Sequence, residues 1–399
     1  MGKNKFDSVM GLVLGSIILF PFNNKPVLIV LFLCYALFLF IKRKEQISGI
    51  ALKKAGLISV LFVPFIVSIF YSYNVERGIT YLIRSLPLLL IPLSFALLQA
   101  ENKRAIIRSF VPAFVVTNAL YIVLMLLYIL QLGYLRSDHD LYYYYSFITY
   151  EFYNIGDHPI YLSVQFAMAL FLLIQNKFFN KIQKTVLFLV LFFGLFFLAR
   201  KGVILSFIII LPLYLSTLTK SKKVLIGSFS VVIMGFLTFM FVPEIKNRYA
   251  ELWSKDGYVK NEVTSTGIRL VLWENSLELI KESPVFGYGI GDNQELFALQ
   301  MESKGYFILA QKKTNCHNQY LQFLLSIGVV GLSFFVLSIL WLFSFFYKNK
   351  AYLGIALVSF FLMVFVSESF LERQNGIITY ALFVSLLVFC VEDFSKERR

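Results

Sequence analysis

Apolar residues along this 399-residue chain fall in long runs that are separated by short polar segments. Each run is about as long as the ~20 residues with which an α-helix crosses a bilayer. The pattern predicts an all-α integral membrane protein with about a dozen transmembrane helices. We expect these helices near residues 8–22, 26–41, 55–72, 79–98, 106–132, 158–175, 183–199, 202–219, 223–242, 317–343, 351–367 and 376–391.

The composition agrees with this interpretation. Hydrophobic residues make up 58% of the chain and charged residues 15%, whereas soluble domains contain roughly 45–50% apolar and about 25% charged residues. The first apolar run ends at residues 21–24 without the small residues of a signal-peptide cleavage site. We therefore expect this run to stay in the protein as the first crossing.

The net charge of +14 is distributed in a way that argues against nucleic-acid binding. If both chain ends are cytoplasmic, the inside segments hold 21 Lys and Arg and six acidic residues, a sum of +15, and the other charges sum to −1. Cytoplasmic loops of membrane proteins carry such an excess of Lys and Arg. We expect a multi-pass protein with both termini in the cytoplasm and no nucleic-acid partner.

The longest polar stretch, residues 243–316, lies between the ninth and tenth predicted crossings and therefore outside the cytoplasm. Within it, apolar residues recur at helical spacing from Gly267 to Glu282,. Thr266 is placed to cap this amphipathic helix, and Ser283 with Pro284 to end it. We interpret residues 1–399 as one polytopic membrane domain that carries residues 243–316 as an extracytoplasmic cap.

Two arginines in external positions are candidates for binding an anion. Arg200 interrupts long apolar runs at the outer mouth of the seventh and eighth crossings, and Lys201 follows it. The positive-inside rule gives no reason for cations outside the cytoplasm, so a bound anion is one explanation for Arg200 and Lys201. The alternative is a tight helical hairpin whose cationic side chains snorkel to the membrane surface. Arg269 lies in the first turn of the external helix, where helix amides and a guanidinium would together bind phosphate. A surface pair with Glu262 or Glu274 is the alternative for Arg269.

His317 opens the tenth crossing, where the cap meets the membrane. An imidazole with an ordinary pKa near ~6.5 accepts a proton from a sugar hydroxyl at neutral pH. A histidine at a helix end also serves as a cap or a packing residue, and we expect such structural roles for His139 and His158. Arg77 and Arg84, at the outer start of the fourth crossing, are further anion candidates.

The sequence contains no pattern typical of a metal, nucleotide or disulfide site. Outside the membrane we find no carboxylate pair with metal-ligand spacing, no zinc pattern and no Gly-rich nucleotide loop, so we expect neither a metal nor a cofactor. The cysteines Cys34, Cys316 and Cys390 form no disulfide pattern,. A donor substrate would therefore have to be anionic and already outside the cytoplasm, which disfavours a cytoplasmic nucleotide-sugar.

Four ordered segments resemble the bacterial O-antigen ligase and polymerase superfamily. They are Ala199-Arg200-Lys201-Gly202; Gly267-Ile268-Arg269 with Trp273, Pro284, Gly287, Gly289 and Gly291; His317-Asn318-Gln319-Tyr320-Leu321 with Gly328 and Gly331; and Ser367-Glu368-Ser369 through Leu371-Glu372-Arg373 and Gly376. They concentrate in residues 199–376. The large external loop between the ninth and tenth crossings is similar to that family as well.

The resemblance implies an enzyme of the bacterial inner membrane whose active site faces the periplasm. Its donor would be a glycan on undecaprenyl diphosphate, and its acceptor the sugar of lipid A-core or another glycan. Arg200 and Arg269 would hold the diphosphate and stabilise it as it leaves, and His317 would act as the base for the acceptor hydroxyl. Lys201, Asn318 and Tyr320 are expected to contribute to substrate binding, with Arg77 and Arg84. Lys201 stands where the family commonly has a small residue.

Three alternatives remain beside an O-antigen ligase. A polymerase of surface polysaccharide would use the same donor, and a protein O-oligosaccharyltransferase the same motifs. A glycolipid transporter would place its polar groups near the bilayer midplane and often has inverted repeats. Here the polar candidates gather at the outer boundary, which favours a transferase.

Overall fold

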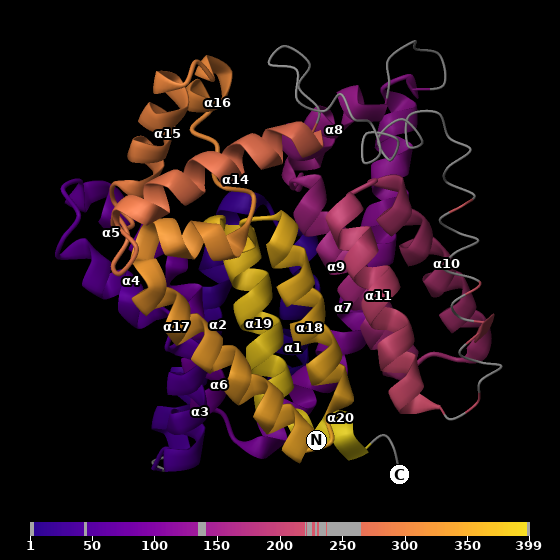
Figure 1. The fold of residues 1–399 in the computed structure, drawn as a ribbon. Helices are drawn as coiled ribbons and strands as arrows, with labels where there is room; N and C mark the ends of the chain where they lie inside the picture. Colours follow the sequence, from indigo (N-terminus) through magenta and orange to yellow (C-terminus); the bar gives the residue numbers. More distant parts are fainter. Residues whose placement is uncertain are drawn as a thin grey trace.

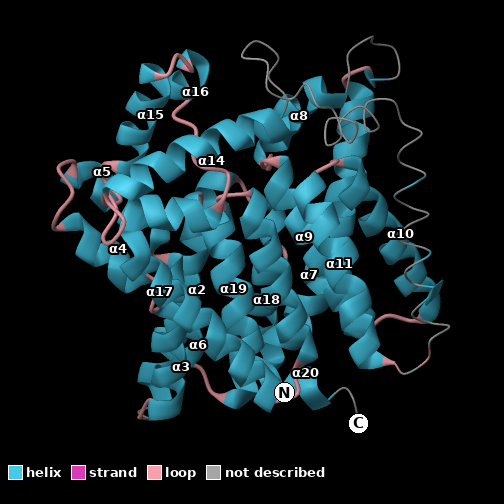
Figure 2. Ribbon diagram, in the orientation of Figure 1, coloured by secondary structure: helices cyan, strands magenta, loops and turns pink. Residues whose placement is uncertain are grey.

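A computed structural model describes residues 4–43, 46–134, 141–219 and 265–396, together with residues 221, 226, 227, 230 and 237. The described residues form helices joined by loops and turns, with no strand among them (Figure 2). The predicted crossing at 223–242 and the first part of the cap, residues 243–264, lie almost entirely outside this described part.

The first half of the chain forms the back and left of the bundle in Figure 1. The long helix α7 packs along α1, and α6 packs against α2 and α3. The helices and their bounds are α1 (Asn4–Gly15), α2 (Lys25–Arg43), α3 (Gly49–Ser59), α4 (Phe62–Ile69), α5 (Val75–Ser85), α6 (Pro87–Leu97), α7 (Ala100–Gln131) and α8 (Leu141–Tyr150). Short 3-10 turns occupy Ile17–Leu19, Phe22–Asn24 and Phe152–Asn154.

The second half supplies the front centre and right of the bundle and the helices across its upper end (Figure 1). In it, α11 packs against α18, and α17 packs against both α18 and α14. The helices are α9 (Pro159–Gln175), α10 (Lys181–Phe197), α11 (Lys201–Leu218), α14 (Ser265–Glu282), α15 (Asn293–Ser303), α16 (Phe307–Gln311), α17 (Gln319–Lys348), α18 (Tyr352–Ser367), α19 (Gln374–Phe389) and α20 (Val391–Lys396). A 3-10 turn, η5 (Phe370–Glu372), joins α18 to α19.

The expected number of crossings is not confirmed. Among the described residues, five helices are long and apolar enough to cross a membrane, or up to seven if each of two bent helix pairs is one span. The apolar runs that gave the sequence prediction are mostly helical, but several are bent or short. The run predicted at 55–72 is α3 and α4, which meet at 58°, and α18 and α19 have 16 residues each, or about 24 Å at 1.5 Å per residue.

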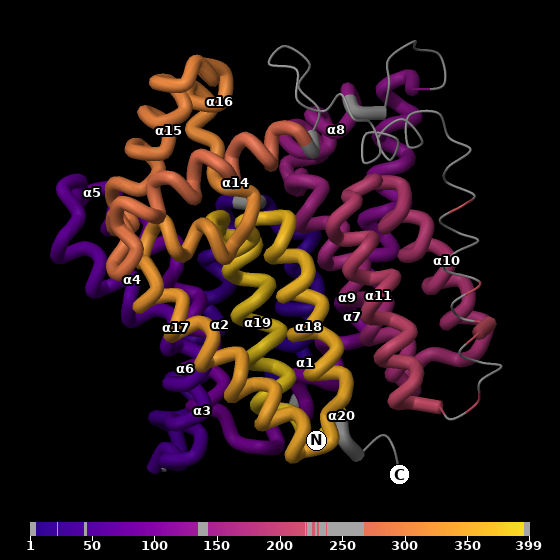
Figure 3. Tube along the Cα trace, in the orientation of Figure 1, coloured from indigo at the N-terminus to yellow at the C-terminus, as the bar shows by residue number. Residues whose placement is uncertain are grey.

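The described part of the cap lies at one end of the bundle. α14 runs across the upper end, with α15 and α16 above it, while α20 and the start of α1 lie at the opposite end (Figures 1 and 3). The helix predicted from Gly267 to Glu282 is confirmed as α14, which ends at Glu282 just before Ser283 as expected. It includes Ser265, so Thr266, which was expected at the start of the helix, lies within it.

A glycine break in α17 anchors the segment that follows α14. Gly328 has a φ of 61° within α17, so the helix is interrupted there. The backbone N–H groups of Tyr288 and Gly289 donate to the carbonyls of Leu325 and Ser326 at 2.9 and 2.8 Å. These bonds fill positions that the break leaves open, and they tie the segment after α14 to α17.

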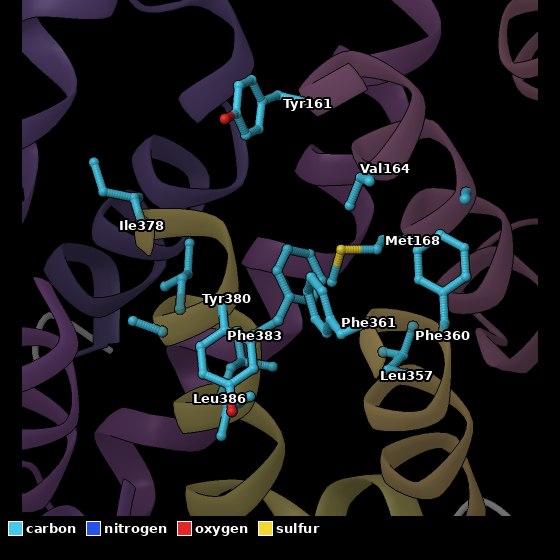
Figure 4. Close-up of a cluster of buried hydrophobic side chains, with 14 of the residues drawn as sticks. Tyr161, Val164, Met168, Leu357, Phe360, Phe361, Ile378, Tyr380, Phe383 and Leu386 are labelled. Atoms are coloured by element: carbon cyan, nitrogen blue, oxygen red, sulfur yellow. The ribbon is translucent and has the colours of Figure 1, made fainter. Parts of the chain in front are cut away.

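The core beneath the outer surface is aromatic. Figure 4 shows side chains of α9, α18 and α19 packed together, with Phe360 and Phe361 of α18 facing Met168, and Tyr161 at the upper edge of the cluster. The Tyr161 ring lies 5.1 Å from that of Phe370 in η5. This packing fixes the ends of α9, α18 and α19 relative to one another, and the candidate site lies at those ends.

Candidate functional site

Glu368 connects two of the three strongest candidates from the sequence. It follows the last residue of α18 and is only 6% exposed. One carboxylate oxygen accepts from the Arg269 guanidinium at 2.6 Å, and the other lies 3.0 Å from Nδ1 of His317. Arg269 also donates through Nε to the carbonyl of Ser367 at 3.2 Å. Helix α14 and the start of α17 are thus held to the end of α18 by one acidic residue.

The electrostatics of this cluster favour an ionised carboxylate. Burial by itself raises the pKa of Glu368, but the neighbouring His317 and Arg269 outweigh burial and bring that pKa down to about 2,. A carboxylate beside Nδ1 stabilises the tautomer that carries its proton on that nitrogen. Nε2 of His317 is then left as the proton acceptor, which is the state a general base requires.

The backbone at His317 is held in an uncommon conformation. Its φ is 46°, in the left-handed region that residues other than glycine seldom adopt. The His317 N–H donates to the side chain of Asn315 at 3.0 Å, and the N–H of Asn318 donates to the Ser369 hydroxyl at 3.1 Å. These two bonds fix the chain on both sides of the imidazole.

Arg200 lies at the start of α11, next to the same end of α18. Gly202 permits this approach, because a Cβ at that position would be 2.0 Å from the Ser367 hydroxyl. The Arg200 guanidinium lies over the ring of Tyr145, 5.1 Å from its centre,. A small cavity of about 50 Å³ brings together the candidates Arg200, Lys201 and Arg269; its lining also includes Ile160, Ala199, Gly202, Val203, Ser367 and Glu368.

Glu368 also lines a larger cavity of about 470 Å³. The polar lining of this cavity comes mainly from α5, from the start of α15, from the loop before α17 and from the turn between α18 and α19. His317 lies in its wall, and Glu368 lines both cavities. The charged lining residues and histidines are Arg77, Arg84, His158, Lys312, Lys313, His317, Glu368, Glu372 and Arg373. The volume falls within the roughly 300–1,000 Å³ of small-molecule sites.

The candidates Arg77 and Arg84 both line this larger cavity. Arg77 forms an ion pair with Glu295 of α15 at 2.8 Å. Arg84 donates to the backbone carbonyl of Glu372 at 3.2 Å, while the Glu372 carboxylate accepts from the Tyr81 hydroxyl at 2.8 Å. Burial raises the pKa of Glu372 to about 7, although the Tyr81 bond and Arg84 oppose the rise. Glu372 is therefore a carboxyl group that titrates near neutral pH.

His158 has both the structural role expected from the sequence and a place in the cavity wall. Its Nδ1 accepts from the N–H of Ile160 at 3.4 Å and so caps α9. Burial, together with the charges of Arg200 and Arg373, lowers the pKa of His158 to about 3. The imidazole is therefore neutral at physiological pH. Glu368 opposes this lowering of the His158 pKa, and His317 adds to it.

Asn318 and Tyr320 are placed differently from the other candidates. The Asn318 side chain caps α17 by accepting from the N–H groups of Tyr320 and Leu321 at 2.9 and 3.1 Å. The Tyr320 hydroxyl donates to the carbonyl of Leu362 in α18 at 2.9 Å. Neither residue is part of the lining of the two cavities. Their contribution to substrate binding stays a prediction, and their visible role is to position His317.

Sequence reasoning assigns no function to several charged groups of the site. Glu368, Glu372 and Arg373 stand out only as part of a motif, and Lys312 and Lys313 do not stand out at all. The motif near residue 370 is a usable signal for the first three. The two lysines precede His317 by only a few residues, in a loop that the charge pattern predicts to be external, where the positive-inside rule gives no reason for cations.

Comparison with known proteins agrees with the resemblance found in the motifs. Residues 186–336 match the model of a protein family described as O-Antigen ligase. This range contains Arg200, Arg269 and His317, whereas Glu368 and Glu372 lie beyond it. The match supports the resemblance of this segment to the O-antigen ligase and polymerase superfamily.

A protein of Haemophilus influenzae, described as uncharacterized, is 32% identical to this chain over 186 residues. The match covers 43% of this chain and 46% of the relative. The chain thus spans about half the length of the curated relative that it matches. This relative gives no information on substrate or reaction.

Proposed function

We propose that this chain, whose residues 186–336 match the O-antigen ligase family, is a membrane glycosyltransferase of the ligase type. It transfers a glycan from undecaprenyl diphosphate to a sugar hydroxyl of lipid A-core on the extracytoplasmic face of the inner membrane. The observation that carries the proposal is the cluster in which Glu368 contacts both Arg269 and His317. One carboxylate thereby joins a base to a cation suited to binding phosphate.

His317 is the base of the proposed reaction. With its Nδ1 proton directed at Glu368, Nε2 takes the proton of the acceptor hydroxyl as that oxygen attacks the anomeric carbon of the donor sugar. The bond from the anomeric carbon to the phosphate oxygen breaks at the same time. Glu368 stabilises the imidazolium that forms.

The cations of the smaller cavity stabilise the leaving group. As the sugar–phosphate bond breaks, negative charge develops on undecaprenyl diphosphate, and fixed positive charges at that place lower the barrier. Arg200 and Lys201 at the start of α11, with Arg269 of α14, line this cavity. The charge they provide makes a metal ion unnecessary for the step, so we propose a metal-independent transfer.

The test is a strain that lacks the gene, complemented with wild type or with Arg200→Ala, Arg269→Ala or His317→Ala. Glycan is resolved on lipid A-core and on the undecaprenyl carrier. We expect each of the three variants to insert normally and to leave lipid A-core without glycan while polymer accumulates on the carrier. Lys281→Gln, which removes an exposed cation of α14 outside both cavities, serves as the matched control and should complement fully.

The same experiment distinguishes a ligase from a polymerase, a transporter and an enzyme that transfers glycan to protein. Lipid A-core that carries a single repeat unit would identify a polymerase instead. An unchanged glycan on both lipids would contradict both forms and favour a transporter or transfer to protein. Full complementation by His317→Ala would remove this residue as the base.

A further inference from the structure

The side chains that line the larger cavity carry an excess of positive charge, because cations outnumber carboxyl groups in its lining. Five cationic side chains line it, namely Arg77, Arg84, Lys312, Lys313 and Arg373, against the two carboxyl groups of Glu368 and Glu372. Glu368 is engaged by Arg269 and His317. The carboxyl group of Glu372 accepts from Tyr81. Neither acid therefore forms an ion pair with any of these five cations.

Most of these cations also have no carboxylate close by in the described part of the chain. Of the five, Arg77 has a carboxylate partner, Glu295. Among the residues that the structure describes, no carboxylate oxygen lies within 4.0 Å of the charged groups of Arg84, Arg373, Lys312 or Lys313. Like charges that face one cavity repel each other, and a bound anion relieves this repulsion.

The position of these cations separates them from the proposed diphosphate site. Arg200, Lys201 and Arg269 line the small cavity and not the larger one, whereas Glu368 lines both. Arg84, Lys313 and Arg373 line the larger cavity alone, as does His317, the proposed base for an acceptor hydroxyl. The loop that carries Lys313 is held to α15, because Gln294 donates to the Lys313 carbonyl at 2.9 Å.

We propose that the larger cavity binds an anionic acceptor, a sugar that carries a phosphate or a carboxylate group near the hydroxyl that is glycosylated. This inference rests on the proposed function for the meaning of acceptor. Arg84 and Arg373 bind the anionic group as guanidinium groups suited to two-point contact with phosphate or carboxylate. Lys312 and Lys313 add charge at the exposed side of the cavity.

A binding experiment tests the inference without any transfer reaction. The full chain in lipid nanodiscs is titrated with glucose, glucose 6-phosphate and glucuronate, and binding is measured by calorimetry. We expect at least one of the two charged sugars to bind about tenfold or more tightly than glucose, as a charge-assisted contact would give. A preference for the phosphate or for the carboxylate identifies which group the acceptor carries. Equal binding of all three sugars would overturn the proposal.

Substitutions of single arginines test where in the protein the charged sugar binds. Arg84→Gln and Arg373→Gln should each weaken binding of the charged sugar about tenfold, whereas Arg84→Lys and Arg373→Lys, which keep the charge, should lose less. Lys281→Gln is the control and should bind as wild type. Arg200→Gln should also keep this binding, because Arg200 lines only the smaller cavity. Loss of binding in Arg200→Gln, or its survival in both Gln variants of the larger cavity, would contradict an acceptor site here.

The binding experiment and the deletion strain together distinguish a failure of the anionic-acceptor proposal from a failure of the proposed function. Equal binding of the three sugars, with glycan still missing from lipid A-core in the deletion strain, would refute the anionic acceptor and leave the transferase standing. Selective binding of a charged sugar, with unchanged glycan in that strain, would refute the transferase and the acceptor role together, and would leave an anion-binding cavity.

Discussion

At the scale of single residues, Glu368 organises the site. Its two oxygens contact different partners, Arg269 at 2.6 Å and His317 at 3.0 Å, so it sets the position of both a guanidinium and an imidazole. A buried carboxylate is unfavourable without such partners. With them it remains ionised, since its pKa is about 2, and its charge is constant throughout the physiological pH range.

Glu368→Gln is expected to abolish most of the activity without unfolding the protein. The amide has the same shape but also donates a hydrogen bond, and it favours the tautomer of His317 whose Nε2 carries the proton. That tautomer is not a base, and in a serine protease the equivalent change lowers kcat about 10⁴-fold. We expect a loss of at least about 10²-fold in the turnover of purified enzyme. Wild-type turnover would show that His317 needs no orienting carboxylate.

Arg269→Lys should also lose activity, although it keeps the charge. The guanidinium donates at once to the Ser367 carbonyl and the Glu368 carboxylate. An ammonium group lacks this fixed two-point geometry. We expect turnover at least about tenfold below wild type, from the loss of one charge-assisted hydrogen bond. If Arg269→Lys were as active as wild type, Arg269 would act only as a point charge.

Glu372 predicts a dependence of stability on pH. Because its folded pKa of about 7 lies above the ordinary 4.5, the protonated form is favoured by folding. The stability that this group contributes is complete below about pH 4.5 and is lost as pH rises through 7. We expect Tm in detergent to fall by a few degrees between pH 5 and pH 8, and Glu372→Gln to reduce that fall.

The control for this measurement is Glu302→Gln, which removes an exposed carboxylate of α15. It should retain the wild-type fall in Tm between the two pH values. If Glu302→Gln and Glu372→Gln behaved alike, the pH dependence would have another origin.

At the scale of elements, the site depends on the close packing of helix ends. The start of α11 approaches the end of α18 at Gly202 and Ser367, and the break in α17 at Gly328 lies against the segment that follows α14. A side chain at Gly328 would meet the carbonyl of Val285 at 2.1 Å. These contacts bring Arg200, Arg269 and His317 together from three different helices or helix ends.

Gly202→Val is expected to separate α11 from α18. The added Cβ would lie 2.0 Å from the Ser367 hydroxyl, so the start of α11, and Arg200 with it, has to move. We expect at least about a tenfold loss of activity, since small misplacement of a site residue has large effects. Ser367→Gly combined with Gly202→Val should restore part of it. Gly56→Val in α3, where an added Cβ would have no other atom within 4 Å, is the matched control and should keep wild-type activity.

At the scale of the whole molecule, the site and the chain ends lie at opposite ends of the bundle (Figure 1). The charge pattern of the sequence predicts that the end with α14 faces outward, because the excess of Lys and Arg belongs inside. The proposed function depends on this orientation, since the proposed lipid-linked donor would be on the outer face.

Cysteine labelling measures the orientation. In a variant whose natural cysteines are replaced by serine, a membrane-impermeant maleimide applied to intact spheroplasts should label Lys281→Cys and not Ser221→Cys; both positions are exposed. Permeabilised cells, in which both should react, are the control. Labelling of Ser221→Cys alone in the intact spheroplasts would reverse the orientation and place the site in the cytoplasm.

The sequence by itself determined the helical character, the approximate position of most helices, and the candidates Arg200, Arg269 and His317. These features are local. An apolar run becomes a helix because its backbone has to bond internally in lipid, and a cation or histidine at the end of such a run is visible from its neighbours alone. The amphipathic helix now seen as α14 was found from its spacing for the same reason.

Only the tertiary structure decided which of these residues lie close together and that Glu368 is the residue that connects them. Glu368 lies 51 positions from His317 and 99 from Arg269, and no periodicity along the chain relates positions so far apart. The bends of short helices, such as that between α3 and α4, also depend on what packs beside them, so hydropathy alone does not locate the point at which a span is broken. The division into a small cavity with Arg200 and a larger one with Arg84 and Arg373 arises where helix ends converge, because a cavity is a property of the space between elements.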